Sequence, residues 1–423
     1  MQLYIDPGTG SMLFTILLGT ITAGSYALRD QIVKLRFWLS GGRTEKSTGD
    51  APDYVIFSDS KRYWNVFEPI CDEFEARRTP LIYMTASPDD PALEKVYEHV
   101  KCEFIGEGNK AFAKLNNLRA DIVLSTTPSL DVFYWKRSKG VKWYVHIPHA
   151  ADDLTKYRMF GIDHYDAVLT SGDYQIGEVR RLEAVRNQPG KEMVNTGLTF
   201  LDTMKERLDR SGKPEKKADG EVNVLLAPSW GPSSIFNRFG SEMIDSLLAT
   251  GYHITIRPHP QSFTSEKEMI EGLMAKYPES DRLEWNRDND NFEVLKRSDI
   301  LISDFSGVVY DFSLVFDKPV IYADVEFDDS PYDACWLDET PWSFSTLERI
   351  GVKLTKDSMG NIKEVIDRCI SDESFQKSRD RARDEGWVCR GESAARVTDY
   401  LIEKHAALME AEAEKPDRSK ESA

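Results

Sequence analysis

The chain contains, at residues 299–322, the run Asp-Ile-Leu-Ile-Ser-Asp-Phe-Ser-Gly-Val-Val-Tyr-Asp-Phe-Ser-Leu-Val-Phe-Asp-Lys-Pro-Val-Ile-Tyr. Its first apolar part, Ile300–Ile302, has the composition and length of a buried strand. The apolar residues that follow recur at helical spacing, at Val308, Phe312, Val315 and Phe316. Lys318-Pro319 ends this helix, and a second apolar run, Val320–Tyr322, follows. The segment therefore predicts a strand–helix–strand unit of an α/β fold.

Small polar residues lie between this strand and this helix, at Ser303, Asp304, Ser306 and Gly307. The start of a helix presents free backbone N–H groups and the positive end of the helix dipole, which favour a phosphate ligand. Ser and Asp are also ordinary N-cap residues, so the segment by itself is equally typical of a well-capped helix.

Length and composition limit the class of protein. The 423 residues suffice for two domains with large cores, and the net charge of −17 argues against a nucleic-acid partner. A small substrate that carries phosphate needs only local positive groups and stays possible. The five cysteines are scattered and form no Cys-x-x-Cys pair, so they are predicted to be reduced thiols. No metal and no cofactor is predicted.

Residues 7–28 carry no charge and are predicted to form a membrane helix of roughly 33 Å. An interfacial or re-entrant segment is the alternative, because glycines and threonines lower its hydrophobicity. Arg29, Lys34 and Arg36 follow closely, which predicts a single N-terminal pass in the cell membrane with the remaining chain in the cytoplasm. A cleaved signal peptide is disfavoured, because no basic region precedes the apolar run.

The rest of the chain alternates strand-like and helical patterns. This predicts two Rossmann-like, doubly wound α/β domains that face a cleft. Residues 40–52 read as a polar linker, 53–202 as the first domain, 203–221 as an interdomain linker, 222–407 as the second domain and 408–423 as a disordered tail. The predicted strands are 54–57, 81–85, 122–125, 143–147, 167–170, 222–227, 253–257, 300–303 and 320–322, and the predicted helices include 63–75, 91–100 and 177–185.

Charged and polar side chains follow several of these strands. Arg257-Pro-His259-Pro comes after the strand 253–257, and each proline holds the residue before it in an extended conformation. Residues two apart in an extended chain point the same way, so Arg257 and His259 form a pair that suits a pyrophosphate. A surface salt bridge and a loop-capping histidine are the alternative. The strand 222–227 leads into a small-residue loop with Ser229 and Trp230, which are possible substrate-binding residues.

Two histidines, His146 and His149, lie at the end of the strand 143–147. His149 is further from the strand, with Asp152 and Asp153 close enough to orient it, and is a candidate general base. A buried histidine bonded to the backbone is an equally weighted alternative. A metal site is less favoured, since no third ligand accompanies the pair.

Arg257-Pro-His-Pro, followed by the motif at 299–312, resembles the CDP-glycerol glycerophosphotransferase family of teichoic-acid primases and polymerases, which have a glycosyltransferase-B-like fold. The resemblance spans roughly residues 140–390. It implies that the second domain binds the nucleotide donor and the first binds the acceptor. Val224–Trp230 resembles the family's strand that ends in Ala-Pro-Thr-Trp, and Thr196–Asp202 its Gly-x-x-x-x-Asp segment.

By this resemblance, Arg257, His259, Ser303, Asp304, Ser306 and Gly307 correspond to donor-phosphate residues, and Asp311 to an acidic residue one turn further. His149 corresponds to the family's catalytic base. The chain departs from the family at three places: Gly307 replaces a second Ser, Ala150-Ala151 replace Gly-Thr after His149, and Gly231-Pro232 follow Trp230 where the family has arginines.

The resemblance implies transfer of glycerol phosphate, or a related alditol phosphate, from a CDP-linked donor to a hydroxyl of a lipid-linked glycan or teichoic-acid-like acceptor, with release of CMP. His149 and His259 are the predicted catalytic residues. Two alternatives remain: a UDP/CDP-sugar glycosyltransferase or UDP-N-acetylglucosamine 2-epimerase-like enzyme of the same fold, and a non-catalytic, membrane-tethered nucleotide-binding protein.

Overall fold

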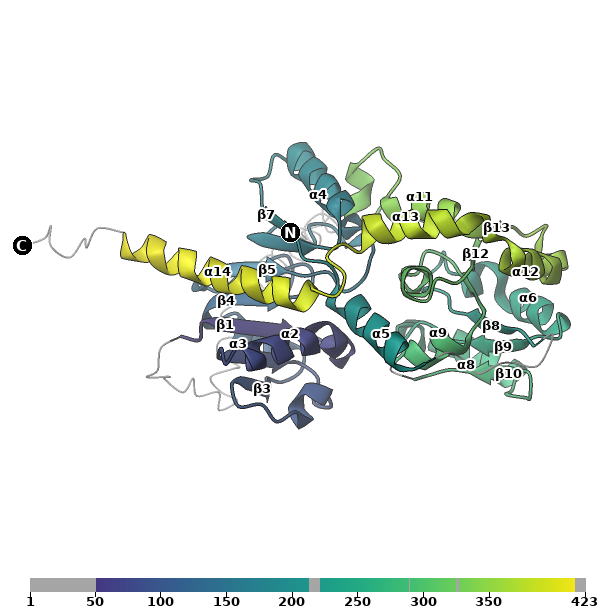
Figure 1. Cartoon of the computed structure of the whole chain (residues 1–423), viewed down its shortest axis with the longest axis horizontal. Coiled ribbons are helices and arrows are strands. Elements are labelled where there is room, and N and C mark those ends of the chain that lie inside the picture. The colour runs from purple at the N-terminus through teal and green to yellow at the C-terminus, as the bar shows by residue number, and fades with distance from the viewer. Residues whose placement is uncertain (1–50, 213–220, 289, 325–326, 415–423) are drawn as a thin grey trace, which may run out of the picture.

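The computed structural model describes residues 51–212, 221–288, 290–324 and 327–414. These residues form two α/β lobes, each built on one parallel sheet (Figure 1). The predicted fold class of two facing doubly wound domains is confirmed. The predicted membrane segment, 7–28, lies outside the described residues. Within the described part of the chain, no helix has the length and apolar character needed to cross a bilayer.

The first domain contains a seven-stranded parallel sheet in the order β3-β2-β1-β4-β5-β6-β7. Its strands are β1 (Tyr54–Ser58), β2 (Leu81–Thr85), β3 (Val100–Phe104), β4 (Arg119–Ser125), β5 (Gly140–His146), β6 (Ala167–Thr170) and β7 (Glu192–Asn195). The helices between them are η1 (Lys61–Tyr63), α2 (Trp64–Ala76), η2 (Pro91–Glu94), α3 (Asn109–Leu115), η3 (Leu154–Lys156), α4 (Asp173–Arg186) and α5 (Thr199–Arg210). The strand order reverses between β1 and β4.

The second domain contains a six-stranded parallel sheet in the order β10-β9-β8-β11-β12-β13, with the reversal between β8 and β11. Its strands are β8 (Asn223–Leu226), β9 (His253–Ile256), β10 (Leu283–Trp285), β11 (Ile300–Ser303), β12 (Val320–Ala323) and β13 (Gly351–Leu354). Its helices are α6 (Ile235–Ala249), α7 (Ser262–Ser265), α8 (Lys267–Lys276), α9 (Phe292–Arg297), α10 (Val308–Tyr310), η4 (Asp311–Val315), η5 (Asp333–Trp336), α11 (Trp342–Ile350), η6 (Met359–Asn361), α12 (Ile362–Ser371), η7 (Glu373–Phe375) and α13 (Gln376–Gly386).

Central strands are buried on both faces, which explains their nearly continuous apolar runs. In β11, Ile300 and Ile302 pack into one core layer, whereas Leu301 packs into the layer on the opposite face. Successive strand residues point to opposite faces, so one short strand contributes to both cores. This is the sheet position that the run at 299–322 predicted.

The last helix, α14 (Ser393–Ala413), returns to the first domain, as the yellow ribbon of Figure 1 shows. Val397, Tyr400 and Leu401 are buried in the same core layer as β1 and α2. The predicted second domain (222–407) included residues 393–407, which the structure places on the first sheet. The predicted tail (408–423) was wrong for residues 408–413, because they continue α14.

The predicted linker 203–221 was wrong in its first part, because residues 203–210 belong to α5. This region is charged on the solvent side, but Leu201 and Met204 are buried on the other. The predicted helix 91–100 was also wrong beyond its first turn. Only Pro91–Glu94 form a short 3-10 helix, and Val100 begins β3.

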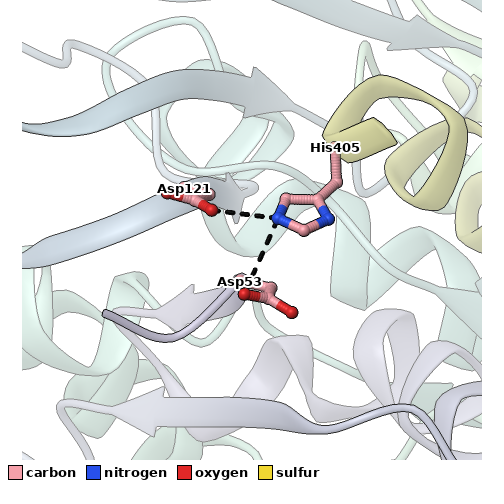
Figure 2. A group of neighbouring side chains, drawn as sticks. All are labelled: Asp53, Asp121 and His405. Carbon is pink, nitrogen blue, oxygen red and sulfur yellow. Dashed lines mark hydrogen bonds and ion pairs between the residues drawn. The ribbon is translucent and has the colours of Figure 1, made fainter. Parts of the chain in front are cut away.

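A polar cluster attaches α14 to the first sheet at the end opposite the strand termini discussed below. His405 Nε2 lies 2.9 Å from Asp121 Oδ2 and 3.6 Å from Asp53 Oδ1 (Figure 2). Lys142 Nζ pairs with Asp121 at 2.9 Å and with Glu412 of α14 at 2.8 Å. Because Lys142 already neutralises Asp121, we interpret the cluster as an ion-pair attachment for the helix.

Candidate active site

A cavity of about 610 Å³ lies between the two domains. Its walls come from the loops after β1 and β5 in the first domain and after β8, β9 and β11 in the second. In open α/β sheets, ligands bind outside the carboxyl ends of the strands where the strand order reverses. Here the reversal points of both sheets open into one cavity.

Ser306 and Gly307 line the cavity at the start of α10. Gly307 is the N-cap residue of this helix, and because it has no side chain it supplies no capping hydrogen bond. After α10 the chain widens into one turn of π-helix, η4, a feature that is frequent at functional sites. A Cβ added to Gly307 would lie 3.5 Å from the Cβ of Ala150, so the two domains approach closely here.

Ser303 and Asp304 do not line the cavity, and the prediction that they contact the donor phosphate is corrected. Both side chains are buried. Ser303 Oγ donates to the carbonyl of Ala227 at 2.6 Å. The carboxylate of Asp304 accepts the backbone N–H groups of Ser229 at 2.9 Å and Ile235 at 3.0 Å. The two residues therefore hold together the loops that follow β8 and β11.

Arg257 lies at the end of β9 and lines the cavity. One guanidinium nitrogen donates to Asn286 Oδ1 and the other terminal nitrogen to the carbonyl of Asp288 at 2.8 Å. These neutral acceptors orient the group without neutralising its charge. Arg257 thus stays available for an anion, and the salt-bridge alternative does not apply within the described residues.

His259 lines the same wall. Its Nδ1 accepts the backbone N–H of Gln261 at 3.1 Å, so the proton of the neutral ring resides on Nε2. Burial lowers its pKa to about 4, and the positive charges of Arg62 and Arg257 act in the same direction. At neutral pH the ring is an uncharged hydrogen-bond donor through Nε2.

His149 lines the cavity from the first domain. Its Nδ1 lies 3.3 Å from the hydroxyl of Thr126, and its ring centroid lies 4.9 Å from that of Tyr63. Burial lowers the pKa of His149 to about 4, so the imidazole is neutral at pH 7. When Nδ1 donates to Thr126, Nε2 carries the lone pair that a general base requires.

Asp152 and Asp153 do not hydrogen-bond to His149, contrary to the sequence prediction. Asp152 pairs with Lys156 at 2.8 Å. Asp153 accepts the backbone N–H groups of Trp342 and Ser343 at 2.7 and 2.8 Å, at the start of α11 in the second domain. Asp152 is thus used in an ion pair and Asp153 in the contact between the domains. Thr126 is the residue that contacts the ring of His149.

His146 is fully buried outside the cavity, with Nε2 3.1 Å from the hydroxyl of Tyr157. Burial lowers its pKa to about 3. His146 is therefore a buried histidine whose partner is a side-chain hydroxyl, and the backbone-bonded alternative for His149 does not apply, because the ring of His149 contacts Thr126.

Asp311, Ser229 and Trp230 all line the cavity. Asp311 is 7% exposed, and its Oδ2 has a long contact of 3.4 Å with the amide of Asn291. Its Oδ1 is buried without a hydrogen-bond partner. Burial raises the pKa of Asp311 to about 7.

Sequence reasoning missed several residues of the first-domain wall, above all Arg62, Lys156 and Tyr157, and the buried Thr126 that contacts His149 behind it. Arg62 follows β1, and Thr126 follows β4, at the reversal of strand order. Arg62 could have been found by considering the residues after every predicted strand. That it lines the same cavity as His149 depends on the order of the strands, which the sequence does not give.

Comparison with known proteins agrees with this architecture. Residues 162–335 match the family described as CDP-Glycerol:Poly(glycerophosphate) glycerophosphotransferase. No curated protein matches the sequence significantly.

Among solved structures, the wall teichoic acid polymerase TagF, a variant soaked with CDPG, is 14% identical, with a TM-score of 0.57 over 94% of this chain and 99% of that one. A UDP complex of MnaA from S. aureus is 14% identical, with a TM-score of 0.58 over 86% of this chain and 99% of that one. UDP-GlcNAc 2-epimerase from Neisseria meningitidis is 13% identical, with a TM-score of 0.50 over 83% of this chain and 100% of that one.

The fold and the cavity between facing sheets define a two-domain enzyme of the glycosyltransferase-B-like class. At these identities the structural likeness establishes the fold alone. The kind of reaction is indicated by the family match over residues 162–335, which supports a CDP-glycerol glycerophosphotransferase-like transferase.

Proposed function

We propose that the protein transfers glycerol phosphate, or a related alditol phosphate, from a CDP-linked donor to a hydroxyl of a lipid-linked envelope glycan or teichoic-acid-like acceptor. The observation that carries the proposal is the pair His149 and His259. They line one cavity from opposite domains, and both are neutral at pH 7. One is suited to accept a proton through Nε2, and the other to donate a hydrogen bond through Nε2.

In the proposed reaction the acceptor hydroxyl attacks the β-phosphorus of the donor. A new bond forms between this oxygen and phosphorus, the bond from phosphorus to the bridging oxygen breaks, and CMP leaves. His149 takes the hydroxyl proton. Arg257, His259 and the backbone at Ser306 and Gly307 stabilise charge on the transferred and leaving phosphates, which is the main requirement of phosphoryl transfer.

Asp311 is proposed to bind a hydroxyl of the donor. Its Oδ1 is buried and unpartnered, and such a group is costly unless a ligand satisfies it. Ser229 and Trp230 lie on the same wall and are proposed to contact the donor as well. Trp230 is 37% exposed and provides an apolar surface beside His259, with ring centroids 6.4 Å apart.

We also propose that the chain acts at the cytoplasmic face of the cell membrane. The support is the uncharged segment 7–28 followed by Arg29, Lys34 and Arg36. A lipid-linked acceptor would then be presented on the surface to which the enzyme is attached.

The test is to incubate the purified protein with CDP-glycerol, CDP-ribitol or UDP-N-acetylglucosamine and measure nucleotide release. We expect CMP from a CDP-alditol when an acceptor is present. Release of UDP alone would support the glycosyltransferase or epimerase alternative, which shares this fold. Binding of CDP-glycerol without release of CMP would support the non-catalytic alternative.

A further inference from the structure

The charged side chains that line the cavity are not all paired. Lys156 pairs with Asp152 at 2.8 Å, and Asp290 pairs with Arg207 at 2.6 Å. By contrast, the arginines of the cavity, Arg62, Arg158 and Arg257, form no ion pair within the described residues. In a chain with a net charge of −17, unpaired guanidinium groups at one cavity indicate an anionic ligand.

Arg62 belongs to the first-domain wall. It lies in η1, directly after β1, and is solvent-exposed. Its Nε contacts the hydroxyl of Ser60 at 3.3 Å, which leaves the two terminal nitrogens without a hydrogen-bond partner in the described part of the chain. The fork of N–H groups that matches a phosphate is therefore open.

Arg62 lies close to the proposed base. The next residue, Tyr63, has its ring 4.9 Å from the ring of His149, and both residues line the cavity with Arg62. The charge of Arg62 also lowers the pKa of both His149 and His259. Arg62 and the two histidines line the same cavity.

We infer that Arg62 binds an anionic group of the acceptor, a phosphate or phosphodiester a few bonds from the attacking hydroxyl. This inference rests on the proposed function, in which His149 contacts the acceptor hydroxyl. The donor phosphates already have Arg257, His259 and the start of α10 on the opposite wall. A cation beside the base is placed to select acceptors that carry phosphate over neutral glycans.

The experiment compares sn-glycerol 3-phosphate with glycerol as soluble acceptor mimics. With CDP saturating the donor site, calorimetry measures the affinity for each in wild type, R62A, R62K and K61A. We expect R62A to weaken sn-glycerol 3-phosphate binding by roughly 10- to 100-fold, R62K less, and glycerol binding to be unchanged. Lys61 is the matched control, because it pairs with Asp89 and does not line the cavity.

Equal affinity of R62A and wild type for sn-glycerol 3-phosphate would overturn the inference. In turnover, we expect R62A to raise KM for the phosphorylated acceptor with little change in kcat. An equal loss of kcat with both acceptors would also overturn it, since Arg62 would then act on the transferred phosphate. If wild type releases no CMP but binds sn-glycerol 3-phosphate through Arg62, the proposed transferase activity fails while the anion site stands.

Discussion

The two walls of the cavity are built differently. The second-domain wall is made of short motifs at successive strand ends, tied together by buried groups such as Asp304 and Ser303. The first-domain wall brings together Arg62 and His149, and the buried Thr126 contacts His149 from behind, so three different strands contribute. The second-domain wall is therefore formed by residues close in sequence, at the ends of neighbouring strands. The first-domain wall is formed by residues far apart in sequence, which only the order of the strands brings together.

This difference agrees with how the two walls relate to the family pattern. The second-domain motifs at 257–259 and 303–307 are retained apart from Gly307, whereas Gly231-Pro232 replace the family's arginines after Trp230. The first-domain motif departs at Ala150, and Ala150 is the residue that faces Gly307 across the cavity at ordinary contact distance.

The largest expected effects come from removing one histidine from each wall. H149A and H259A should each lower turnover by roughly 10²- to 10⁴-fold, because each removes a proton acceptor or a charge-stabilising donor. H149A should bind CDP-glycerol as wild type does, and H259A should bind it less tightly. CMP release and calorimetry measure both quantities.

The matched control for the histidines is H164A, since His164 is exposed and does not line the cavity. If H149A and H259A turn over and bind like H164A, neither wall takes part in catalysis as proposed.

The buried hydrogen bonds of Asp304 and Ser303, which connect the loops of the second-domain wall, should contribute to stability. D304A leaves the N–H groups of Ser229 and Ile235 without their acceptor, at a cost of roughly 2–6 kcal/mol in unfolding free energy. S303A removes one hydrogen bond and should cost about 1 kcal/mol. Urea unfolding measures both.

S306A, in contrast, should weaken CDP-glycerol binding with little change in stability. Loss of donor affinity in S303A at unchanged stability would contradict the assignment.

Asp311 gives the second-domain wall a pH dependence. Its pKa is raised from 3.8 to about 7 in the folded state, so the folded protein holds a proton that the unfolded chain has lost. Its contribution therefore lowers stability as pH rises from about 4 to 7. The shift corresponds to a loss of roughly 4 kcal/mol in unfolding free energy above pH 7. Replacing Asp311 by Asn removes this loss, but the buried amide also lacks hydrogen-bond partners, which offsets part of the gain.

We thus expect D311N to unfold at a higher temperature than wild type at pH 8, with a smaller difference at pH 5. D290N is the control, because Asp290 is exposed and paired with Arg207. A D311N stability difference that is the same at both pH values would rule out ionisation of Asp311 as the cause.

The smallest effect is expected at the opposite end of the first sheet. H405A removes the contact of α14 with Asp121 and Asp53 (Figure 2). The nearer pair, His405 and Asp121, is 18% and 10% exposed, but Lys142 still pairs with Asp121 in the variant, so the loss should be about 1 kcal/mol. CMP release should be unchanged. A drop in turnover would show that this end of the sheet communicates with the cavity.

Much of the fold could be predicted because each prediction rested on a local pattern. The apolar runs at 81–85, 167–170 and 300–303 have the same bounds as β2, β6 and β11. The edge strands β3, β7, β10 and β13 were missed, because an edge strand needs fewer apolar residues. Helix α14 was assigned to the wrong domain, since its amphipathic pattern does not indicate which sheet it covers.

The sequence by itself determined the alternation of strands and helices, and it predicted Arg257, His259, Ser306, Gly307 and His149, which all line one cavity. Spacing along one strand and its following loop is enough for such inferences. The tertiary structure alone decided that Asp304 is a buried tie, that Thr126 replaces Asp152 and Asp153 as the partner of His149, and that Arg62 faces the same cavity. These relations join residues far apart in the chain, and strand order and domain packing bring them together.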